Sequence, residues 1–527
     1  MRLSLYPWQR ACMESWLSNE GHGIVQVVTG AGKTFMALSC AHHLDGLYHG
    51  RLKVRILVPK TFMVAQWKSF ILDQQEQLGI RREDIGIWHG QHKDPPDRKV
   101  MLYVINSARM VFSRHMLAEL DQGTPMMLIA DECHHYASAE NRKIFEFLPL
   151  VPDAMRTRLH TLGLSATPQA EGFDEILVPS LGPLIYSYGF SEAMAQQVIN
   201  NCTLYNVSLD MATKEREKYD KLSQGISSIL KKLELGPLVD AKGVSEQFFI
   251  RIRKLTGDAD PMTAEMARNL LVLLFKRKAL VHEASVRIDC AFHIIERLDP
   301  QSRIIVFSER IRQTDALYDM LSIRWPGQVA RYHSHMGDMA KIRSLARYRE
   351  QEVRILVCCR ALDEGFDIPA ADVGIVLSGT STKRQRIQRL GRILRRAEGK
   401  LVSNLFYLYL HDTMEDHALF TEGTEEIQEF DLRFLGPAEG FLHPVYDRLA
   451  NQVVQQEIAQ GTDARTVAWY EHFLLQGQLR SDWLMDEQSL SAFMGNATSL
   501  AERNYWMCMV RMVHTMHVAT SGFVHQN

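Results

Sequence analysis

Short apolar runs alternate with amphipathic stretches in the first third of the chain. The runs are rich in β-branched residues and lack the polar alternation of a strand that has one face in water. Such runs are typical of parallel strands that helices cover on both faces, so the sequence predicts a doubly wound α/β domain. The five runs are 24–28, 54–58, 101–105, 126–130 and 160–164.

A second series of apolar runs predicts another parallel sheet of similar size. Its members are 303–307, 354–358, 373–377 and 405–409. Between the two series the chain is charged and has helical periodicity, and one helix face is marked by Leu271, Leu274, Phe275, Lys278 and His282. After about residue 425 the pattern is again mostly helical and carries aromatics such as Trp469, Tyr470, Trp483, Tyr505 and Trp506.

The resulting domain scheme has four parts. We expect an α/β domain over 1–190, a helical insertion over 191–298, a second α/β domain over 299–425 and a helical accessory domain over 426–527. A chain of 527 residues is long enough for two to four domains of ordinary size.

Composition fits a folded protein and limits how nucleic acid could bind. Apolar residues make up 46% of the chain and charged residues 23%, which excludes a disordered chain. The formal net charge is only −2, so any contact with a polyanion must come from a local basic groove. The eight cysteines form no Cys-x-x-Cys pair, and no apolar run is long enough for a membrane span. We therefore expect a cytoplasmic protein that contacts no membrane.

A glycine-rich turn follows the first apolar run where a helix is expected to begin. Small residues let the backbone N–H groups surround a phosphate, and the helix N-terminus adds partial positive charge. Lys33 would reach the outer phosphates of ATP, and Thr34 would hold Mg²⁺. A chance Lys-Thr pair after a turn is the alternative, but strand, turn and helix come in the required order. The predicted phosphate site is Thr29, Gly30, Ala31, Gly32, Lys33 and Thr34.

An acidic pair ends the fourth apolar run. A carboxylate at a strand end can hold the Mg²⁺ that bridges the phosphates, and a second can orient or deprotonate the attacking water. We assign the metal role to Asp131 and the water role to Glu132. A zinc site at Cys133, His134 and His135 is the alternative, but three adjacent side chains cannot converge on one tetrahedral ion. His134 is expected to relay the state of the nucleotide.

Further short motifs follow at intervals along residues 1 to 425. They are Tyr6-Pro7-Trp8-Gln9, Val58-Pro59-Lys60-Thr61 with Gln66-Trp67, Asn106-Ser107, Ser165-Ala166-Thr167-Pro168, Phe307-Ser308, the segment 362–369 and the arginine-rich segment 385–396. Together with the phosphate loop and the acidic pair, they resemble the motifs of superfamily 2 helicases. The phosphate loop has Val27 where the general pattern has glycine, a departure that this superfamily commonly shows.

The resemblance implies two RecA-like domains and a role for each motif. Gln9 would read the adenine edge, and Gly365 and Asp367 would sense nucleotide in the cleft between the domains. The strand-end motifs at 58–61 and 106–107 would touch the nucleic-acid backbone. The segment 165–168 would couple the two domains.

The arginine-rich segment supports a role in catalysis on physical grounds as well. On a helix, Gln388, Arg392 and Arg395 lie on one face. An arginine supplied from a second domain stabilises the charge on a transferring phosphoryl group, an effect of about 10³ to 10⁵ in rate. We assign this role to Arg392 and Arg395, with Gln388 and Arg389 in support. A solvated basic helix or a DNA-contacting patch is the alternative.

We expect an ATP-driven motor that moves along nucleic acid through backbone contacts. The acidic box and the arginine-rich segment are closest to the XPB-like and restriction-enzyme-like helicases, which favours DNA over RNA and a role in repair, transcription or antiviral defence. A protein partner would bind through residues 426–527. Two alternatives stay open: an ATP-dependent sensor or remodelling subunit that separates no strands, and an added hydrolase at His411, Asp412 and His417.

Overall fold

The chain divides into two units, and each contains one sheet of eight strands among the residues that the structure describes. The first unit is formed by residues up to 199, and the described residues from 201 onward belong to the second. The structure is a computed structural model. It describes residues 4–90, 92–138, 140–169, 171–199, 201–235, 239–240, 243–244, 246–298, 300–359, 371–378, 402–413, 415, 428–442, 444–475 and 487–521.

The first sheet contains all five strands that the apolar runs predict. These are β1 (His22–Val27), β2 (Lys53–Val58), β5 (Val100–Val104), β6 (Met126–Asp131) and β7 (Leu159–Ser165). The sheet also contains β3 (Ile85–His89), β4 (His92–Lys93) and β8 (Leu184–Tyr188), which the runs do not predict. The order is β4-β3-β5-β2-β6-β7-β1-β8, and every pair is parallel except β3 with β4. The carboxyl ends of the five predicted strands therefore share one edge.

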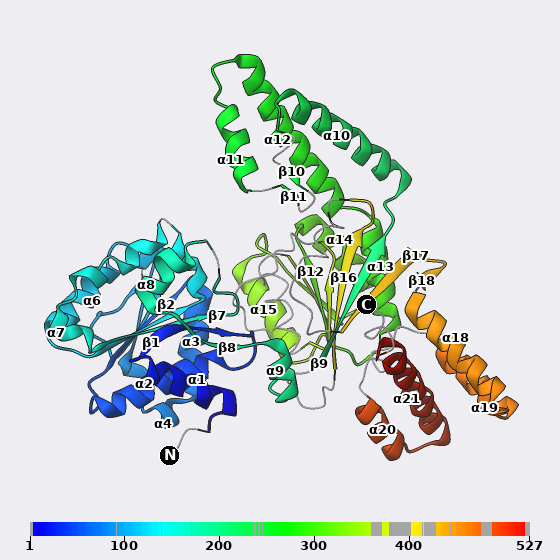
Figure 1. Ribbon diagram of the computed structural model, residues 1–527, viewed down its shortest axis with the longest axis horizontal. Helices are drawn as coiled ribbons and strands as arrows, with labels where there is room; N and C mark the ends of the chain where they lie inside the picture. Colours follow the sequence, from blue (N-terminus) through cyan, green and yellow to red (C-terminus); the bar gives the residue numbers. More distant parts are fainter. Residues whose placement is uncertain are drawn as a thin grey trace. The chain divides into compact units, whose positions relative to one another are not determined.

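Helices cover both faces of this sheet, as a doubly wound domain requires. Figure 1 shows α1, α2 and α4 on one face and α6, α7 and α8 on the other. The helices are α1 (Pro7–Ser18), α2 (Lys33–Leu47), α3 (Thr61–Asp73), α4 (Gln75–Leu78), α5 (Ile105–Ala108), α6 (Phe112–Asp121), α7 (Asp153–Arg156), α8 (Val178–Leu181) and α9 (Phe190–Ala195). Single helical turns are η1 (Arg82–Asp84), η2 (Cys133–Ala137), η3 (Asn141–Phe145), η4 (Leu148–Leu150) and η5 (Phe173–Leu177).

The second sheet contains the four predicted strands and four more. The predicted ones are β12 (Ile304–Ser308), β14 (Ile355–Cys359), β15 (Val373–Val376) and β16 (Val402–Leu410). The others are β9 (Asn201–Leu209), β13 (Val329–Tyr332), β17 (Gln428–Gly436) and β18 (Gly440–Leu442). The order is β13-β14-β12-β15-β16-β9-β17-β18, with only β17 and β18 antiparallel. Around it lie α13 (Val286–Arg297), α14 (Ile311–Arg324) and α15 (Asp338–Arg349).

Two strands of the second sheet come from segments for which the sequence pattern predicts helices. Strand β9 lies in the expected helical insertion and pairs with β16 along its whole length, from Asn201 with Val402 to Leu209 with Leu410. Strand β17 lies beyond residue 425 and pairs with β9 on its other side. The predicted segments 191–298 and 426–527 thus each contribute to the second sheet, and the boundaries between domains stay predictions.

The helices of the insertion are α10 (Thr213–Lys232), α11 (Glu246–Leu255) and α12 (Pro261–His282), with the short hairpin β10 (Val239–Asp240) and β11 (Gly243–Val244). They enclose a small core of their own, formed by Ile226, Leu235, Phe248, Ile252, Ala267 and Leu270. Leu271 and Leu274 pack against this core, as the helix face predicts. Phe275 does not: it is 63% exposed.

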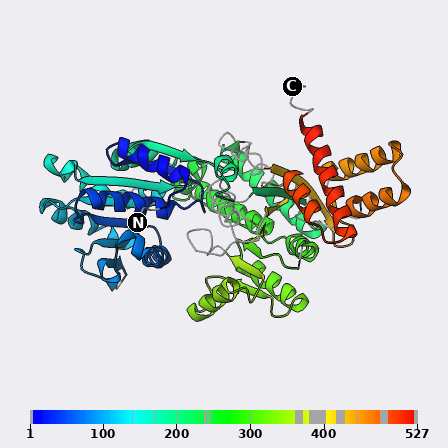
Figure 2. The same cartoon turned by 90° about the horizontal axis from the view of Figure 1, so that it is seen from below.

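The C-terminal helices share the hydrophobic core of the second sheet. They are α18 (Pro444–Ala459), α19 (Ala464–Tyr470), η7 (Glu471–Leu475), α20 (Glu487–Asn496) and α21 (Leu500–Ser521), and Figure 2 shows them in orange to red. Tyr470 and Tyr505 are buried in that core, and Trp506 packs against it. Trp483 lies outside the described residues.

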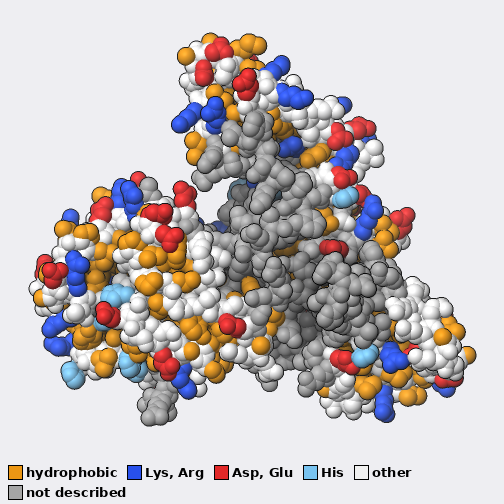
Figure 3. Space-filling view, in the orientation of Figure 1, with side chains coloured by type: hydrophobic (Ala, Val, Ile, Leu, Met, Phe, Trp, Pro, Cys, Tyr) orange, Lys and Arg blue, Asp and Glu red, His pale blue; other side chains and the backbone are white. Residues whose placement is uncertain are grey.

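Charges of both signs are mixed on the surface. On the face shown in Figure 3, Lys and Arg side chains alternate with Asp and Glu over the described parts. No helix among the described residues is long and apolar enough to cross a bilayer.

Candidate nucleotide site

The predicted phosphate loop connects β1 to α2 and needs two glycines for its shape. Gly30 has φ 89° and Gly32 has φ 98°, which are left-handed conformations that a side chain disfavours. Gly32 is the N-cap of α2, so Lys33 is the first residue of that fifteen-residue helix. The loop therefore presents a helix N-terminus, whose free N–H groups and partial positive charge favour a phosphate.

Gln9 on α1 packs directly against the phosphate loop. Its amide nitrogen Nε2 donates to the carbonyl oxygen of Gly32 (3.1 Å), and its Oε1 accepts from the backbone N–H of Tyr6 (3.0 Å). The side chain is only 1% exposed. The neighbouring Trp8 stacks on Tyr188 with ring centroids 4.9 Å apart. The motif Tyr6-Pro7-Trp8-Gln9 is thus fixed against the phosphate loop by the hydrogen bond from Gln9 to Gly32.

The acidic pair lies at the carboxyl end of β6. The indole N–H of Trp67 donates to Asp131 Oδ2 (2.8 Å), and the backbone N–H of Glu132 donates to Asp131 Oδ1 (3.0 Å). Glu132 has φ 48°, an uncommon left-handed conformation for a residue with a side chain. Strained backbone of this kind persists where the surroundings fix it, and it clusters at functional sites.

The charges around the pair fit a cationic ligand. Burial, and then the nearby Glu132 carboxylate, raise the pKa of Asp131 to about 6, although the Lys33 ammonium and the Trp67 hydrogen bond act in the opposite direction. Two buried atoms, Lys33 Nζ and Glu132 Oε2, have no hydrogen-bond partner among the residues that the structure describes. A site with an unsatisfied ammonium and unsatisfied carboxylate oxygen suits a polyphosphate with its metal ion.

His134 connects the acidic pair to the end of strand β7. The Nδ1 atom of His134 lies 2.8 Å from Ser165 Oγ at the end of β7 and 3.6 Å from Glu132 Oε2. The same Ser165 hydroxyl oxygen accepts the backbone N–H of Thr167 (3.0 Å). His134 therefore bridges the acidic pair and the segment 165–168, where a relay of nucleotide state would have to lie.

The predicted nucleic-acid contacts lie at the same edge of the first sheet. Lys60 follows β2, and Asn106 and Ser107 follow β5, two strands that run parallel to β6. Ser107 Oγ accepts the backbone N–H of Gly90 (3.0 Å), and Arg109 donates to Asn106 Oδ1. These residues are therefore fixed at one sheet edge together with the nucleotide motifs.

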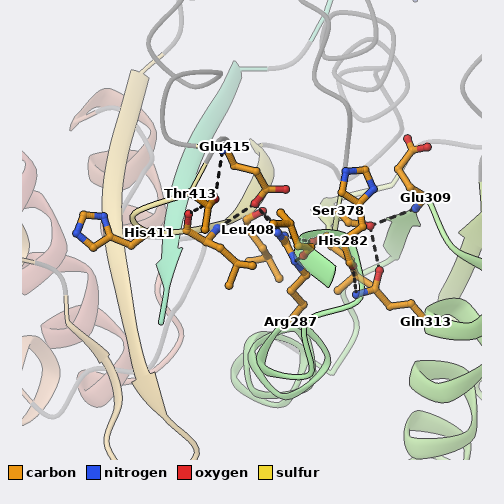
Figure 4. A network of polar contacts seen from close by, with 12 residues as sticks. His282, Arg287, Glu309, Gln313, Ser378, Leu408, His411, Thr413 and Glu415 are labelled. Atoms are coloured by element: carbon orange, nitrogen blue, oxygen red, sulfur yellow. Dashed lines mark hydrogen bonds and ion pairs between the residues drawn. The ribbon is translucent and has the colours of Figure 1, made fainter. Parts of the chain in front are cut away.

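Gln313 ties together strand ends at the corresponding edge of the second sheet (Figure 4). Its Oε1 accepts from the hydroxyls of Ser308 (2.9 Å) and Ser378 (3.0 Å). Ser308 is the last residue of β12, and Ser378 follows β15. Its Nε2 donates to the carbonyl oxygen of His282 at the end of α12 (3.0 Å). Ser378 also accepts the backbone N–H of Glu309 (3.3 Å).

Arg287 forms a second, fully buried junction in the same network (Figure 4). Its guanidinium donates to the carbonyl oxygens of Val281 (3.0 Å), Leu377 (2.5 Å) and Leu408 (2.8 Å), and it pairs with Glu415. Arg287 thus joins α13 to the carboxyl ends of β15 and β16.

Several predicted site residues lie outside the described residues. These are Gly365, Asp367, Gln388, Arg389, Arg392 and Arg395, and their roles stay predictions.

The alternative metal sites gain no support from the described residues. Cys133 is buried in the hydrophobic core, and burial raises the pKa of its thiol. His411 Nε2 lies 3.5 Å from Asp412 Oδ1, while His417 lies outside the described residues. Within the described part of the chain, no three His, Cys, Asp or Glu side chains are grouped so that they could hold a metal ion.

The contact between Trp67 and Asp131 does not follow from the sequence. The pair Gln66-Trp67 stood out only as part of a motif for nucleic acid. The signal was the buried helix face of α3, on which Trp67 lies with Met63, Val64 and Ile71, but such a face does not identify a hydrogen-bond acceptor 64 residues away.

Two family models match the chain. The model described as "Type III restriction enzyme, res subunit" matches residues 2–170, and "Helicase conserved C-terminal domain" matches residues 287–397. The first match covers the phosphate loop and the acidic pair, and the second covers the segment 385–396.

Individual relatives agree with these matches. The chain is 28% identical over 400 residues to the DNA 3'-5' translocase XPB2 of Sulfurisphaera tokodaii, covering 75% of this chain and 80% of that protein. It is 22% identical over 406 residues to the DNA 3'-5' helicase XPB of Mycobacterium tuberculosis, and it spans only 59% of that protein's length. The solved Hef helicase domain of Pyrococcus furiosus has a TM-score of 0.54 at 15% identity and covers 79% of this chain and 98% of that one, a likeness of fold alone.

Proposed function

The chain belongs to the superfamily 2 helicases of the XPB-like and restriction-enzyme-like branch, and on this premise we propose that it couples ATP hydrolysis to movement along DNA. Members of this superfamily are nucleic-acid-dependent ATPases. The observation that carries the proposal is the edge of the first sheet, where Lys33 and Glu132 each keep a buried polar atom without a hydrogen bond among the described residues.

The nucleotide would bind at the phosphate loop through this chain's own donors. Lys33 Nζ would pair with the outer phosphates, because a buried ammonium without a partner is unfavourable. Gln9 has one amide N–H and one lone pair of Oε1 left after its two hydrogen bonds, which suits the donor and acceptor on an adenine edge. Thr34 and Asp131 would hold Mg²⁺, which when bound polarises the phosphates and neutralises developing charge.

Glu132 would orient and deprotonate the attacking water. Its Oε2 is not engaged in a hydrogen bond, whereas both oxygens of Asp131 accept one. His134, which lies between Glu132 and Ser165, would transmit the state of this carboxylate to the segment 165–168.

The segments 362–369 and 385–396 would complete the site. Arg392 and Arg395 would stabilise the charge of the transferring phosphoryl group, with Gln388 and Arg389 in support and Gly365 and Asp367 sensing the nucleotide. The match of a helicase C-terminal model through residue 397 supports this assignment. Hydrolysis would then need both the phosphate loop and the arginine-rich segment, so a motion that brings the two together would be tied to ATP turnover.

Nucleic acid would be held through its backbone at the strand ends of both units. Lys60, Thr61, Asn106 and Ser107 are candidates in the first unit, and backbone contacts carry no sequence information. Two of the relatives are named as a DNA translocase and a DNA helicase, which supports DNA as the substrate. Residues 426–527 would receive a protein partner, and the exposed Leu435, Ile458 and Leu500 support this part of the proposal.

A comparison of ATPase rates tests the proposal. The rate is measured without nucleic acid and with single-stranded DNA, duplex DNA or RNA, beside a Lys33→Ala control that loses the phosphate contact. We expect DNA to raise the rate of the wild-type chain, RNA to raise it less, and the control to stay inactive throughout. Equal rates in all four conditions would contradict a nucleic-acid motor.

A further inference from the structure

Trp67 holds one oxygen of the carboxylate that is proposed to bind the metal ion. Its side chain is 3% exposed, and its indole N–H donates to Asp131 Oδ2 at 2.8 Å. The other oxygen, Oδ1, accepts the backbone N–H of Glu132 at 3.0 Å. The carboxylate of Asp131 is therefore fixed from two sides, by its own strand end and by helix α3.

Helix α3 begins at the motif that is proposed to touch nucleic acid. Lys60 is its N-cap and Thr61 its first residue, and Trp67 follows six residues later, about 9 Å along the helix axis. Met63, Val64 and Ile71 bury the same face of the helix. Less than two helical turns separate Thr61 from Trp67, so a shift of the first turn of α3 would also move the indole.

We propose that Trp67 is a positioning residue that couples nucleic-acid contact at Lys60 and Thr61 to the orientation of the Asp131 carboxylate. This inference rests on the proposed function. The terminal torsion of an aspartate is broad, so a carboxylate without an external donor samples many orientations. Partners that fix a metal-binding carboxylate typically change metal affinity 10- to 100-fold when they are removed.

Trp16 provides a matched control within the same unit. It is also fully buried, and its indole N–H donates to the carbonyl oxygen of Thr161 at 2.9 Å. Thr161 lies near the amino end of β7, at the edge of the sheet opposite the acidic pair. A change of Trp16 to Phe removes a buried donor of the same kind but leaves Asp131 untouched.

The experiment compares W67F with W16F in the full chain. The affinity for the fluorescent nucleotide mant-ADP is titrated with Mg²⁺ and with EDTA, and the ATPase KM and kcat are measured with and without single-stranded DNA. We expect W67F to lose about 10-fold or more of the Mg²⁺-dependent affinity and most of the DNA stimulation, while its affinity in EDTA is unchanged. W16F should keep both properties and lose only thermal stability.

A third variant tests the other end of α3. Lys60→Ala should reduce DNA stimulation and leave the Mg²⁺-dependent affinity for mant-ADP intact. The proposal is overturned if W67F matches W16F in Mg²⁺ dependence and in DNA stimulation, since Trp67 would then only fill space. Should the melting curve show W67F unfolded, Trp67→Met, a flexible side chain without a donor, makes the same comparison.

The outcomes also separate this inference from the proposed function. If DNA fails to stimulate the wild-type ATPase, the motor is contradicted, whereas the mant-ADP titrations still decide whether Trp67 positions Asp131. If DNA stimulates the wild type and W67F equally, the coupling through Trp67 is wrong and the motor is unaffected.

Discussion

Asp131 and Glu132 are adjacent in sequence yet sit in different surroundings. Both oxygens of Asp131 accept hydrogen bonds, and the side chain is 9% exposed. Glu132 adopts a left-handed backbone conformation and keeps one buried oxygen without a hydrogen bond among the described residues. The first carboxylate is therefore held from two sides, whereas Oε2 of the second lies 3.6 Å from the Nδ1 atom of His134.

The division of roles predicts how Glu132→Gln behaves. The amide keeps the size of the side chain but cannot accept a proton, so the ATPase rate should fall by about 10² to 10⁴ while mant-ADP affinity is retained. Steady-state kinetics and a fluorescence titration measure the two quantities. A rate within a few-fold of the wild type would identify another residue as the base.

His160, at the other edge of the sheet, makes the first unit sensitive to pH. Its Nε2 atom lies 3.0 Å from the hydroxyl of Tyr48, and its Nδ1 atom lies 3.3 Å from the carbonyl oxygen of Glu20. Burial, and then the nearby His22, lower the pKa of His160 to about 4. The folded unit therefore holds this imidazole neutral at pH values where the unfolded chain protonates it.

The first unit should therefore become less stable as the pH falls. A His with a lowered pKa contributes its full stability above the unfolded value near 6.5 and loses it as the pH falls towards 4, on the order of 3 kcal/mol in total. His160→Gln should flatten the fall of the free energy of unfolding between pH 7 and 4.5, although the lowered pKa of His22 leaves part of it. Urea denaturation at several pH values measures this, with the half-exposed His92→Gln as control. An unchanged slope in His160→Gln would refute the assignment.

At the scale of elements, the buried central strands were predictable and the peripheral ones were not. All nine apolar runs are strands, because a strand covered on both faces needs apolar side chains at every position. Strand β9 instead buries Thr203 and Asn206, and β17 carries charges such as Asp431 and Arg433. Their pairing partners lie about two hundred residues away, so no local pattern shows that they join the second sheet.

The same distinction holds for the candidate site. The phosphate loop and the acidic pair are each local, and the sequence alone located both at strand ends. The hydrogen bonds that organise them, such as Trp67 to Asp131 and His134 to Ser165, join segments that the chain brings together only in the folded sheet. Spacing was therefore enough to propose the chemistry, while the residues that position the proposed site required the structure.

The network around Gln313 allows a test at this scale. Gln313→Ala removes the hydrogen bonds to Ser308, Ser378 and the carbonyl oxygen of His282, and should lower the free energy of unfolding of the second unit by about 1–3 kcal/mol. Urea denaturation monitors the loss. The exposed Asp319→Ala on the same helix α14 should change stability by no more than about 0.5 kcal/mol. Equal effects of the two variants would show that the network contributes little.

For the whole molecule, the proposed catalytic residues fall within two separate family matches. The phosphate loop and acidic pair belong to the first match, and the arginine-rich segment to the second. The helical insertion has its own small core, whereas the C-terminal helices share the core of the second sheet. Any movement of the second unit should therefore carry the described C-terminal helices with it.

Displacement of a triplex-forming strand from duplex DNA tests this account most directly, because a motor that moves along duplex removes the third strand without needing to separate the other two. The account predicts displacement that requires ATP and that is lost in Glu132→Gln and in Lys33→Ala. DNA-stimulated ATP hydrolysis by the wild type with no displacement would contradict it and favour a sensor or remodelling subunit.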